Sequence, residues 1–264
     1  MRPAYEVLDG TGPPILLVHG VLSSNRQWQP NLAALSKVGR PVLLELLGHG
    51  ASPAPSDPEA YRPESYVEAL EEIRRELRAE SWYLVGYSLG ARITFEYALR
   101  HPSRVLAHVV TNTLSGFSTP RWIQATKEVM SDILADVRQR GRPAIEAMPI
   151  HPKNSSRLDP EMRDGLCRDL ANSDPLGIAL TATETALSPP LTEAMSGNQV
   201  PTLLTCGCLE ERFLPRRDWA AENLPHLTVL DLDAAHAVNV EAADAWNAAV
   251  VSFFREHPPA EPPA

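Results

Sequence analysis

The sequence predicts an α/β protein with a mostly parallel central sheet that is covered by helices on both faces. Short runs rich in Val, Leu and Ile alternate with segments of helical pattern, as in repeated strand–helix–strand units. The runs are almost continuously apolar, which is typical of strands buried on both faces. The predicted strands lie within residues 13–20, 40–50, 81–88, 104–112, 200–207 and 227–233. The predicted helices cover residues 24–37, 63–79, 89–100, 215–224 and 239–256.

One segment interrupts this alternation. Residues 116–196 contain helical patterns at 121–140 and 159–172 but no convincing strand. We therefore predict a core formed by residues 1–115 and 197–257, with 116–196 as a helical lid inserted between two core strands. The proline-rich residues 258–264 are expected to form a flexible tail.

Composition limits the classes of function. The chain has 264 residues, 44% of them hydrophobic and 22% charged, so it can bury a substantial core and is not disordered as a whole. Its net charge of -9 disfavours nucleic acid and anionic membranes as partners. No run of about 18 apolar residues is present, and the first ten residues do not resemble an export leader. We expect a cytoplasmic protein that acts on a small molecule.

No cofactor or metal is expected. The sequence contains no P-loop, no G-x-G-x-x-G and no H-E-x-x-H pattern. Its three cysteines, Cys167, Cys206 and Cys208, lack the paired spacing of a zinc site or a disulfide framework.

The most informative motif lies between a predicted strand and a predicted helix. Residues 86–90 read Gly-Tyr-Ser-Leu-Gly, which is the G-x-S-x-G pattern of a nucleophilic serine on a sharp turn. Glycines two residues before and after the serine allow the tight turn, where side chains would collide with backbone. Ser88 would then lie at the N-terminus of a helix, whose partial positive charge favours a developing oxyanion.

A serine hydroxyl needs a general base, and the base needs an acidic group to orient it. His236 follows the last predicted strand and precedes the last helix, which is the expected position of the base. The acid should follow the strand at 200–207, where Glu210 and Glu211 are the candidates. We favour Glu210 and keep Glu211 as the alternative.

Two backbone N–H groups should form an oxyanion hole. Leu89, directly after the nucleophile, would provide one of them. Val21 would provide the other, because His19-Gly20 ends an early strand and the glycine permits a close approach of the backbone.

These motifs, in this order, resemble the α/β-hydrolase superfamily along nearly the whole chain. The resemblance implies an α/β-hydrolase fold, but the fold supports many reactions. Three stretches are also similar to the 2-succinyl-6-hydroxy-2,4-cyclohexadiene-1-carboxylate synthases of menaquinone biosynthesis. They are GYSLGAR, CGCLEERF and RDLANSDPLGIALTATET. This second likeness implies that Arg92 and Arg168 bind substrate carboxylates.

Three functions follow as hypotheses. The first is a serine hydrolase that cleaves a carboxylic ester, lactone or thioester through Ser88, His236 and Glu210. The second is a menaquinone-pathway-type lyase that uses the same triad to eliminate pyruvate from a dicarboxylate. The third is a non-catalytic receptor for a small molecule. Tyr87, beside the nucleophile, and Trp122, in the insertion, are further candidate substrate-binding residues. The oligomeric state is left open.

Overall fold

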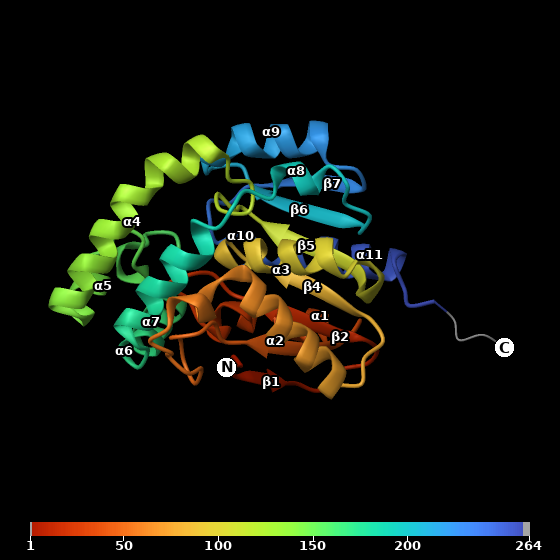
Figure 1. Cartoon of the computed structure of the whole chain (residues 1–264). Coiled ribbons are helices and arrows are strands. Elements are labelled where there is room, and N and C mark those ends of the chain that lie inside the picture. Colours follow the sequence, from red (N-terminus) through yellow and green to blue (C-terminus); the bar gives the residue numbers. More distant parts are fainter. Residues whose placement is uncertain (1, 261–264) are drawn as a thin grey trace.

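The protein is built around one seven-stranded sheet (Figure 1). The structure is a computed structural model, and it describes residues 2–260. The strands are β1 Tyr5–Val7, β2 Pro14–Val18, β3 Arg40–Leu44, β4 Trp82–Gly86, β5 Val105–Thr111, β6 Thr202–Gly207 and β7 Leu227–Leu232. Their order in the sheet is β1-β3-β2-β4-β5-β6-β7, and only β1 pairs antiparallel with its neighbour. The mostly parallel sheet predicted from the sequence is confirmed.

Helices cover both faces of the sheet. Successive residues of a strand point to opposite faces, so each central strand contributes apolar side chains to both layers of helices. Leu16 and Val18 of β2 pack with α2 (Pro63–Glu76) and α3 (Leu89–Arg100). Ile15 and Leu17 of the same strand pack instead with α1 (Gln29–Leu35) and α11 (Ala243–Glu256). A third apolar cluster joins β6 to α8 (Thr192–Met195) and α9 (Leu214–Asn223). The central strands are therefore buried on both faces, as their apolar runs indicated.

The segment between β5 and β6 is helical. It contains α4 Pro120–Arg140, α5 Arg142–Glu146, α6 Pro160–Ala171, α7 Pro175–Leu180, a π-helical turn Thr181–Thr185 and α8. Helices α4 to α7 lie together beyond one end of the sheet (Figure 1). Proline in the first turn and a capping side chain start several of them: Thr119, Asp159 and Asp174 each accept a backbone N–H.

A buried network of amide side chains ties the last part of the chain to the first. Asn239, in α10 (Val238–Glu241), donates to the Gln27 carbonyl at 3.0 Å and to Asn31 Oδ1 at 2.9 Å. Gln27 donates in return to Asn239 Oδ1 at 3.0 Å, and Asn31 donates to the Asn239 carbonyl at 2.9 Å. These bonds satisfy polar groups that would be costly to bury without partners.

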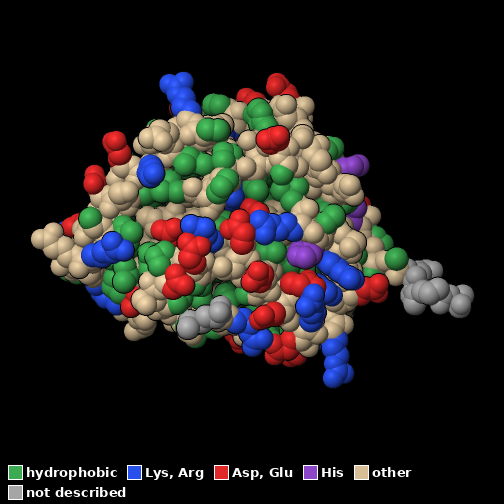
Figure 2. All heavy atoms as spheres, in the orientation of Figure 1, with side chains coloured by type: hydrophobic (Ala, Val, Ile, Leu, Met, Phe, Trp, Pro, Cys, Tyr) green, Lys and Arg blue, Asp and Glu red, His purple; other side chains and the backbone are tan. Residues whose placement is uncertain are grey.

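The surface carries charges of both signs. Figure 2 shows acidic and basic side chains interspersed over the middle and lower part of one face. Among residues 2–260, no helix combines the length and apolar character needed to cross a membrane. The predicted tail falls largely on residues 261–264, which lie outside the described part of the chain.

Candidate active site

Ser88 lies on the sharp turn predicted between β4 and α3. Its backbone has φ 52° and ψ −114°, a strained conformation for a residue with a side chain. The neighbouring glycines are required by packing. A Cβ at Gly86 would lie 2.5 Å from Ala91 Cα, and one at Gly90 would lie 2.1 Å from the Val18 carbonyl oxygen. The turn therefore presses α3 against β2 and presents Ser88 at the edge of the sheet.

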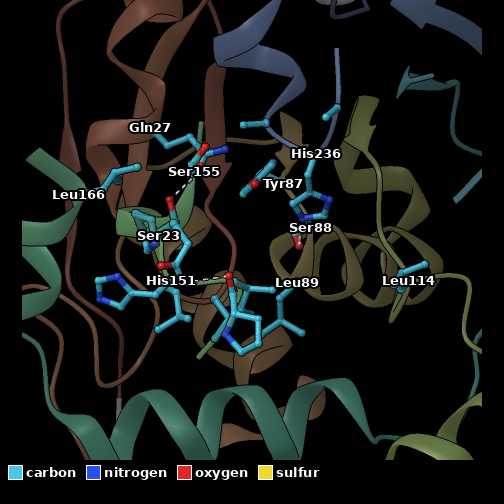
Figure 3. A pocket seen from close by; sticks show the side chains of 18 of the residues that line it. Ser23, Gln27, Tyr87, Ser88, Leu89, Leu114, His151, Ser155, Leu166 and His236 are labelled. Carbon is cyan, nitrogen blue, oxygen red and sulfur yellow. Dashed lines mark hydrogen bonds between the residues drawn. The ribbon is translucent and has the colours of Figure 1, made fainter. Parts of the chain in front are cut away.

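His236 meets Ser88 from the turn after β7. Its Nε2 lies 2.9 Å from Ser88 Oγ, and its Nδ1 lies 2.7 Å from Glu210 Oε2. The side chains of His236 and Ser88 point toward one another in the cavity (Figure 3). A carboxylate on Nδ1 keeps the Nδ1–H tautomer, which leaves Nε2 free to accept the serine proton.

Glu210 supplies the carboxylate, and Glu211 points elsewhere. Glu210 is buried, whereas Glu211 is exposed at the start of a short 3-10 turn. Burial acts to raise the pKa of Glu210. Two effects of His236, its hydrogen bond and its positive charge, act in the opposite direction, and so do the hydrogen bonds from Asn112 and Arg212. Together they outweigh burial and lower the pKa of Glu210 to about 2. Glu210 is therefore ionised across the neutral range.

Two partners of Glu210 were not predicted. Asn112 Nδ2 donates to Glu210 Oε2 at 2.9 Å and to the Gly207 carbonyl at 3.0 Å. Arg212 Nε donates to Glu210 Oε1 at 2.7 Å. The signal that could have found Asn112 is its position at the end of a predicted strand, at the edge where parallel strands bring functional side chains together.

The two residues predicted to supply the oxyanion-hole amides both belong to the lining of the cavity. Val21 and Leu89 line it beside Ser88. Leu89 is the first residue of α3, so its N–H has no acceptor within the helix. Within the described chain, the Val21 N–H likewise has no backbone acceptor. A Cβ at Gly20 would lie 2.9 Å from Ser88 Cβ, so this glycine permits the close approach of the two loops.

A cavity of about 440 Å³ opens above Ser88. Its floor comes from the turns after the strands, and its walls come from the helical segment between β5 and β6. Most of the lining is apolar, with polar groups at a few points. The apolar lining residues include Leu22, Leu114, Met130, Leu166 and Val240, and the polar ones include Ser23, Gln27, His151, Arg157 and Glu241. Figure 3 shows Leu114 and Leu166 on opposite sides of Ser88.

The four predicted substrate-binding residues separate into two groups. Tyr87 and Trp122 both line the cavity, and the Tyr87 ring packs edge to face on His236 with centroids 5.3 Å apart. Arg92 does not line it. Arg92 is 2% exposed and its Nη2 donates to the Pro189 carbonyl at 2.8 Å and to Glu96 at 3.2 Å. Arg168 is exposed on α6, also away from the cavity lining.

The arrangement of Arg92 and Arg168 corrects the sequence-based expectation that they lie at the substrate. Arg92 follows Ser88 by four residues, but helix α3 directs it into the packing beside Pro189 instead of toward the cavity. The arginines that line the cavity are Arg157 and Arg212, and neither belonged to the pattern that suggested carboxylate binding.

Among residues 2–260, no group of three or more His, Cys, Asp or Glu side chains is placed to hold a metal ion. All three cysteines are free.

The chain is similar to known proteins along most of its length. A family model described as alpha/beta hydrolase fold matches residues 13–243. A protein of Bacillus subtilis (strain 168), named as a 2-succinyl-6-hydroxy-2,4-cyclohexadiene-1-carboxylate synthase, is 27% identical over 95% of this chain and 94% of its own. A proline iminopeptidase of Heyndrickxia coagulans is also 27% identical, over 96% of this chain and 95% of its own.

Solved structures give the same architecture. MenH from S. aureus superposes with a TM-score of 0.85 at 20% identity, covering 97% of this chain and 99% of that one. This likeness concerns the fold. The enol-lactonase from Burkholderia xenovorans LB400 superposes with a TM-score of 0.80 at 25% identity, with 96% of each chain covered.

Proposed function

Because the chain belongs to the α/β-hydrolase family and is an enzyme of that type, we propose that it is a serine hydrolase. Its substrates are small carboxylic esters, lactones or thioesters. The observation that supports this most directly is the continuous relay from Ser88 Oγ to His236 at 2.9 Å and from His236 to Glu210 at 2.7 Å.

The chemistry follows from that relay. His236 Nε2 takes the proton of Ser88 as Oγ attacks the carbonyl carbon, and the Val21 and Leu89 amides bind the oxyanion that forms. Collapse of this intermediate breaks the bond to the leaving group, which receives the proton from His236. Water, activated by His236, then attacks the acyl-enzyme and releases the acid and Ser88.

The size and the lining of the cavity favour a substrate with a small and largely apolar acyl group. Its volume of about 440 Å³ is within the range of small-molecule sites. Both lining arginines are already paired, Arg157 with Glu241 and Arg212 with Glu210. Neither arginine is therefore an unpaired cation that would require an anionic substrate.

Ester hydrolysis with a matched serine control tests the proposal. The substrate is p-nitrophenyl butyrate, and the released phenolate is followed for the wild type, Ser88→Ala and Ser196→Ala. We expect Ser88→Ala to lose activity by about a thousandfold or more, because no other hydroxyl in the site contacts His236 Nε2. Ser196, whose hydroxyl donates to the Glu193 carbonyl and which does not line the cavity, serves as the control. Ester turnover by Ser88→Ala at the wild-type rate would contradict the proposal.

A proton-abstracting lyase is the second candidate. It is favoured by the full-length likeness to the Bacillus subtilis protein, but Arg92 and Arg168 lie away from the cavity lining. Mass spectrometry of the quenched reaction separates the two. A hydrolase gives an acyl adduct on Ser88, whereas the lyase releases pyruvate from its dicarboxylate substrate with no adduct. The relatives described above are named as enzymes, which favours catalysis over the receptor hypothesis.

A further inference from the structure

The turn that carries His236 is held by a carboxylate that the relay itself does not use. Glu241, at the end of α10, accepts the Ala235 N–H on Oε2 at 2.9 Å and the Ala237 N–H on Oε1 at 3.1 Å. One side chain thus fixes the peptide groups on both sides of the catalytic histidine. The Glu241 side chain is 5% exposed, so these N–H groups take the place of water.

The partner of this carboxylate comes from the helical segment over the cavity. Arg157 Nε donates to Glu241 Oε2 in an ion pair. Arg157 lies between α5 and α6, in a stretch whose residues 149–152, 154–155 and 157–158 also line the cavity. The same side chain therefore contacts the substrate space and the residue that holds the His236 turn.

A neutralised carboxylate is needed at this place. Burying the Glu241 carboxylate without a counter-charge would be unfavourable, and the two peptide N–H groups supply only partial positive charge. The Arg157 guanidinium supplies the full charge, while its own side chain remains 46% exposed. Through Arg157, the segment over the cavity therefore forms an ion pair with Glu241, the residue that holds the His236 turn.

We propose that Glu241 is a positioning residue for His236, and that Arg157 couples the placement of residues 149–158 to the alignment of the base. The inference rests on the proposed serine hydrolase chemistry. When the segment closes over a substrate, Arg157 completes the carboxylate site and the His236 turn is fixed. When the segment withdraws, Glu241 loses its counter-charge and the turn loosens.

The charged groups around His236 determine the direction in which each variant should move the pH dependence of activity. Glu210 and Glu241 are the nearby acids, from the loop after β6 and from α10. Arg212 pairs with Glu210 and Arg157 pairs with Glu241, with Asp233 acting on Arg157 from the same turn. The Tyr87 ring packs on the imidazole from the nucleophile turn. Removing the charge of Glu241 favours the neutral imidazole, and removing that of Arg157 favours the protonated one.

Activity and its pH dependence in Glu241→Gln, Arg157→Gln and Arg157→Lys test the proposal. An amide at 241 keeps one acceptor, so one peptide N–H loses its partner, and we expect kcat to fall about tenfold or more with KM within about twofold. We expect the acidic limb of the pH–rate profile to move by about half a unit, to lower pH in Glu241→Gln and to higher pH in Arg157→Gln. Arg157→Lys keeps the charge and should return the limb toward the wild-type position.

A matched control and a substrate-free readout complete the experiment. Arg163→Gln removes a nearby arginine on α6, one that pairs with Asp164 and does not line the cavity. It should leave kcat and the acidic limb in place. The low-field proton resonance of His236 Nδ1–H should exchange with water faster in Glu241→Gln than in the wild type, in the absence of any substrate.

The outcomes separate this inference from the proposed function. A wild type without esterase activity that also fails to react with a fluorophosphonate refutes the hydrolase, and the Nδ1–H exchange still decides the role of Glu241. An active wild type whose kcat and acidic limb are unchanged in both charge-removing variants overturns the inference. So does a shift in the same direction in both variants.

Discussion

Glu210 holds a charge in a buried position because three side chains donate to it. His236, Asn112 and Arg212 each contact one of its oxygens. The network makes the relay depend on contacts across the sheet edge as well as on the three residues of the motif. It also ties the stability of the fold to the ionisation of this one group.

The depressed pKa of Glu210 gives a pH dependence with a definite sign. The folded-state pKa of about 2 lies below the ordinary value of 4.5, so the contribution to stability is fully present above about 4.5 and is lost as pH falls toward 2. We expect the free energy of unfolding of the wild type to fall more steeply over this range than that of Glu210→Gln. Urea unfolding at pH 7, 4.5 and 3 measures it. Parallel pH dependences in the two proteins would show that Glu210 does not carry the effect.

Some residues of the site could be predicted from the sequence and others could not. Ser88, His236 and Glu210 stand in a fixed order at strand ends, so local pattern and chain position locate them, and the structure brings them together. The contacts of Asn112, Arg157 and Glu241 depend on how distant segments pack, and no spacing along the chain encodes such contacts. Arg92 shows the converse: its spacing from Ser88 matched a family pattern, but its helix directs it away from the cavity.

At the scale of elements, the prediction was accurate where packing is dense. The six predicted strands correspond to β2–β7, of which β2–β6 are buried, although the strand predicted within 40–50 extends past Leu44, where β3 ends. The helices that cover them were also predicted. Strand β1 was missed, because it has three residues on the sheet edge and none of them is buried. The predicted helix at 239–256 is divided, since α10 ends at Glu241 and α11 begins at Ala243. The short α10 is the element that presents Glu241 to the His236 turn.

The end of β6 and the His236 turn are packed too closely for a side chain. A Cβ on Gly207 would lie 1.8 Å from the Ala235 carbonyl oxygen, so Gly207→Ala must displace the turn. We expect a loss of stability of about 1–3 kcal/mol and a loss of kcat of about tenfold or more. Gly197→Ala is the control, because its Cβ would meet only the Ala194 carbonyl oxygen at 3.5 Å. Thermal unfolding and ester turnover of both variants check this, and equal behaviour of the two would contradict it.

At the scale of the whole molecule, the helical segment over the cavity is attached unevenly. Its later part is fixed to the core: Thr181 Oγ1 donates to the Leu47 carbonyl at 2.7 Å, and the Asp174 N–H donates to the Gly48 carbonyl at 2.9 Å. Helix α4 is less supported, with Val137 as the one buried residue of its 21. The helical character of 116–196 was predictable from its pattern. Its action as a lid stays a prediction, because sequence pattern does not encode relative motion.

The buried amides around Asn239 join the two halves of the core. Replacing Asn239 with Ala leaves Asn31 and Gln27 with unpaired buried groups, each costing about 1–3 kcal/mol. We expect Asn239→Ala to lower the free energy of unfolding by about 2–4 kcal/mol. Asn223→Ala removes an exposed amide that donates to the Trp219 carbonyl and should have little effect. Urea unfolding compares the two, and equal midpoints would refute the assigned role.

This network also has a consequence for the order in which the protein is made. Gln27 and Asn31 leave the ribosome 212 and 208 residues before Asn239, and Gln27 is part of the cavity wall. During synthesis these amides can be satisfied only by water, so the wall beside Ser88 cannot take its final form. Ser88 is therefore synthesised long before the cavity wall beside it can form. The proposed hydrolytic activity therefore requires that the last helices have been added.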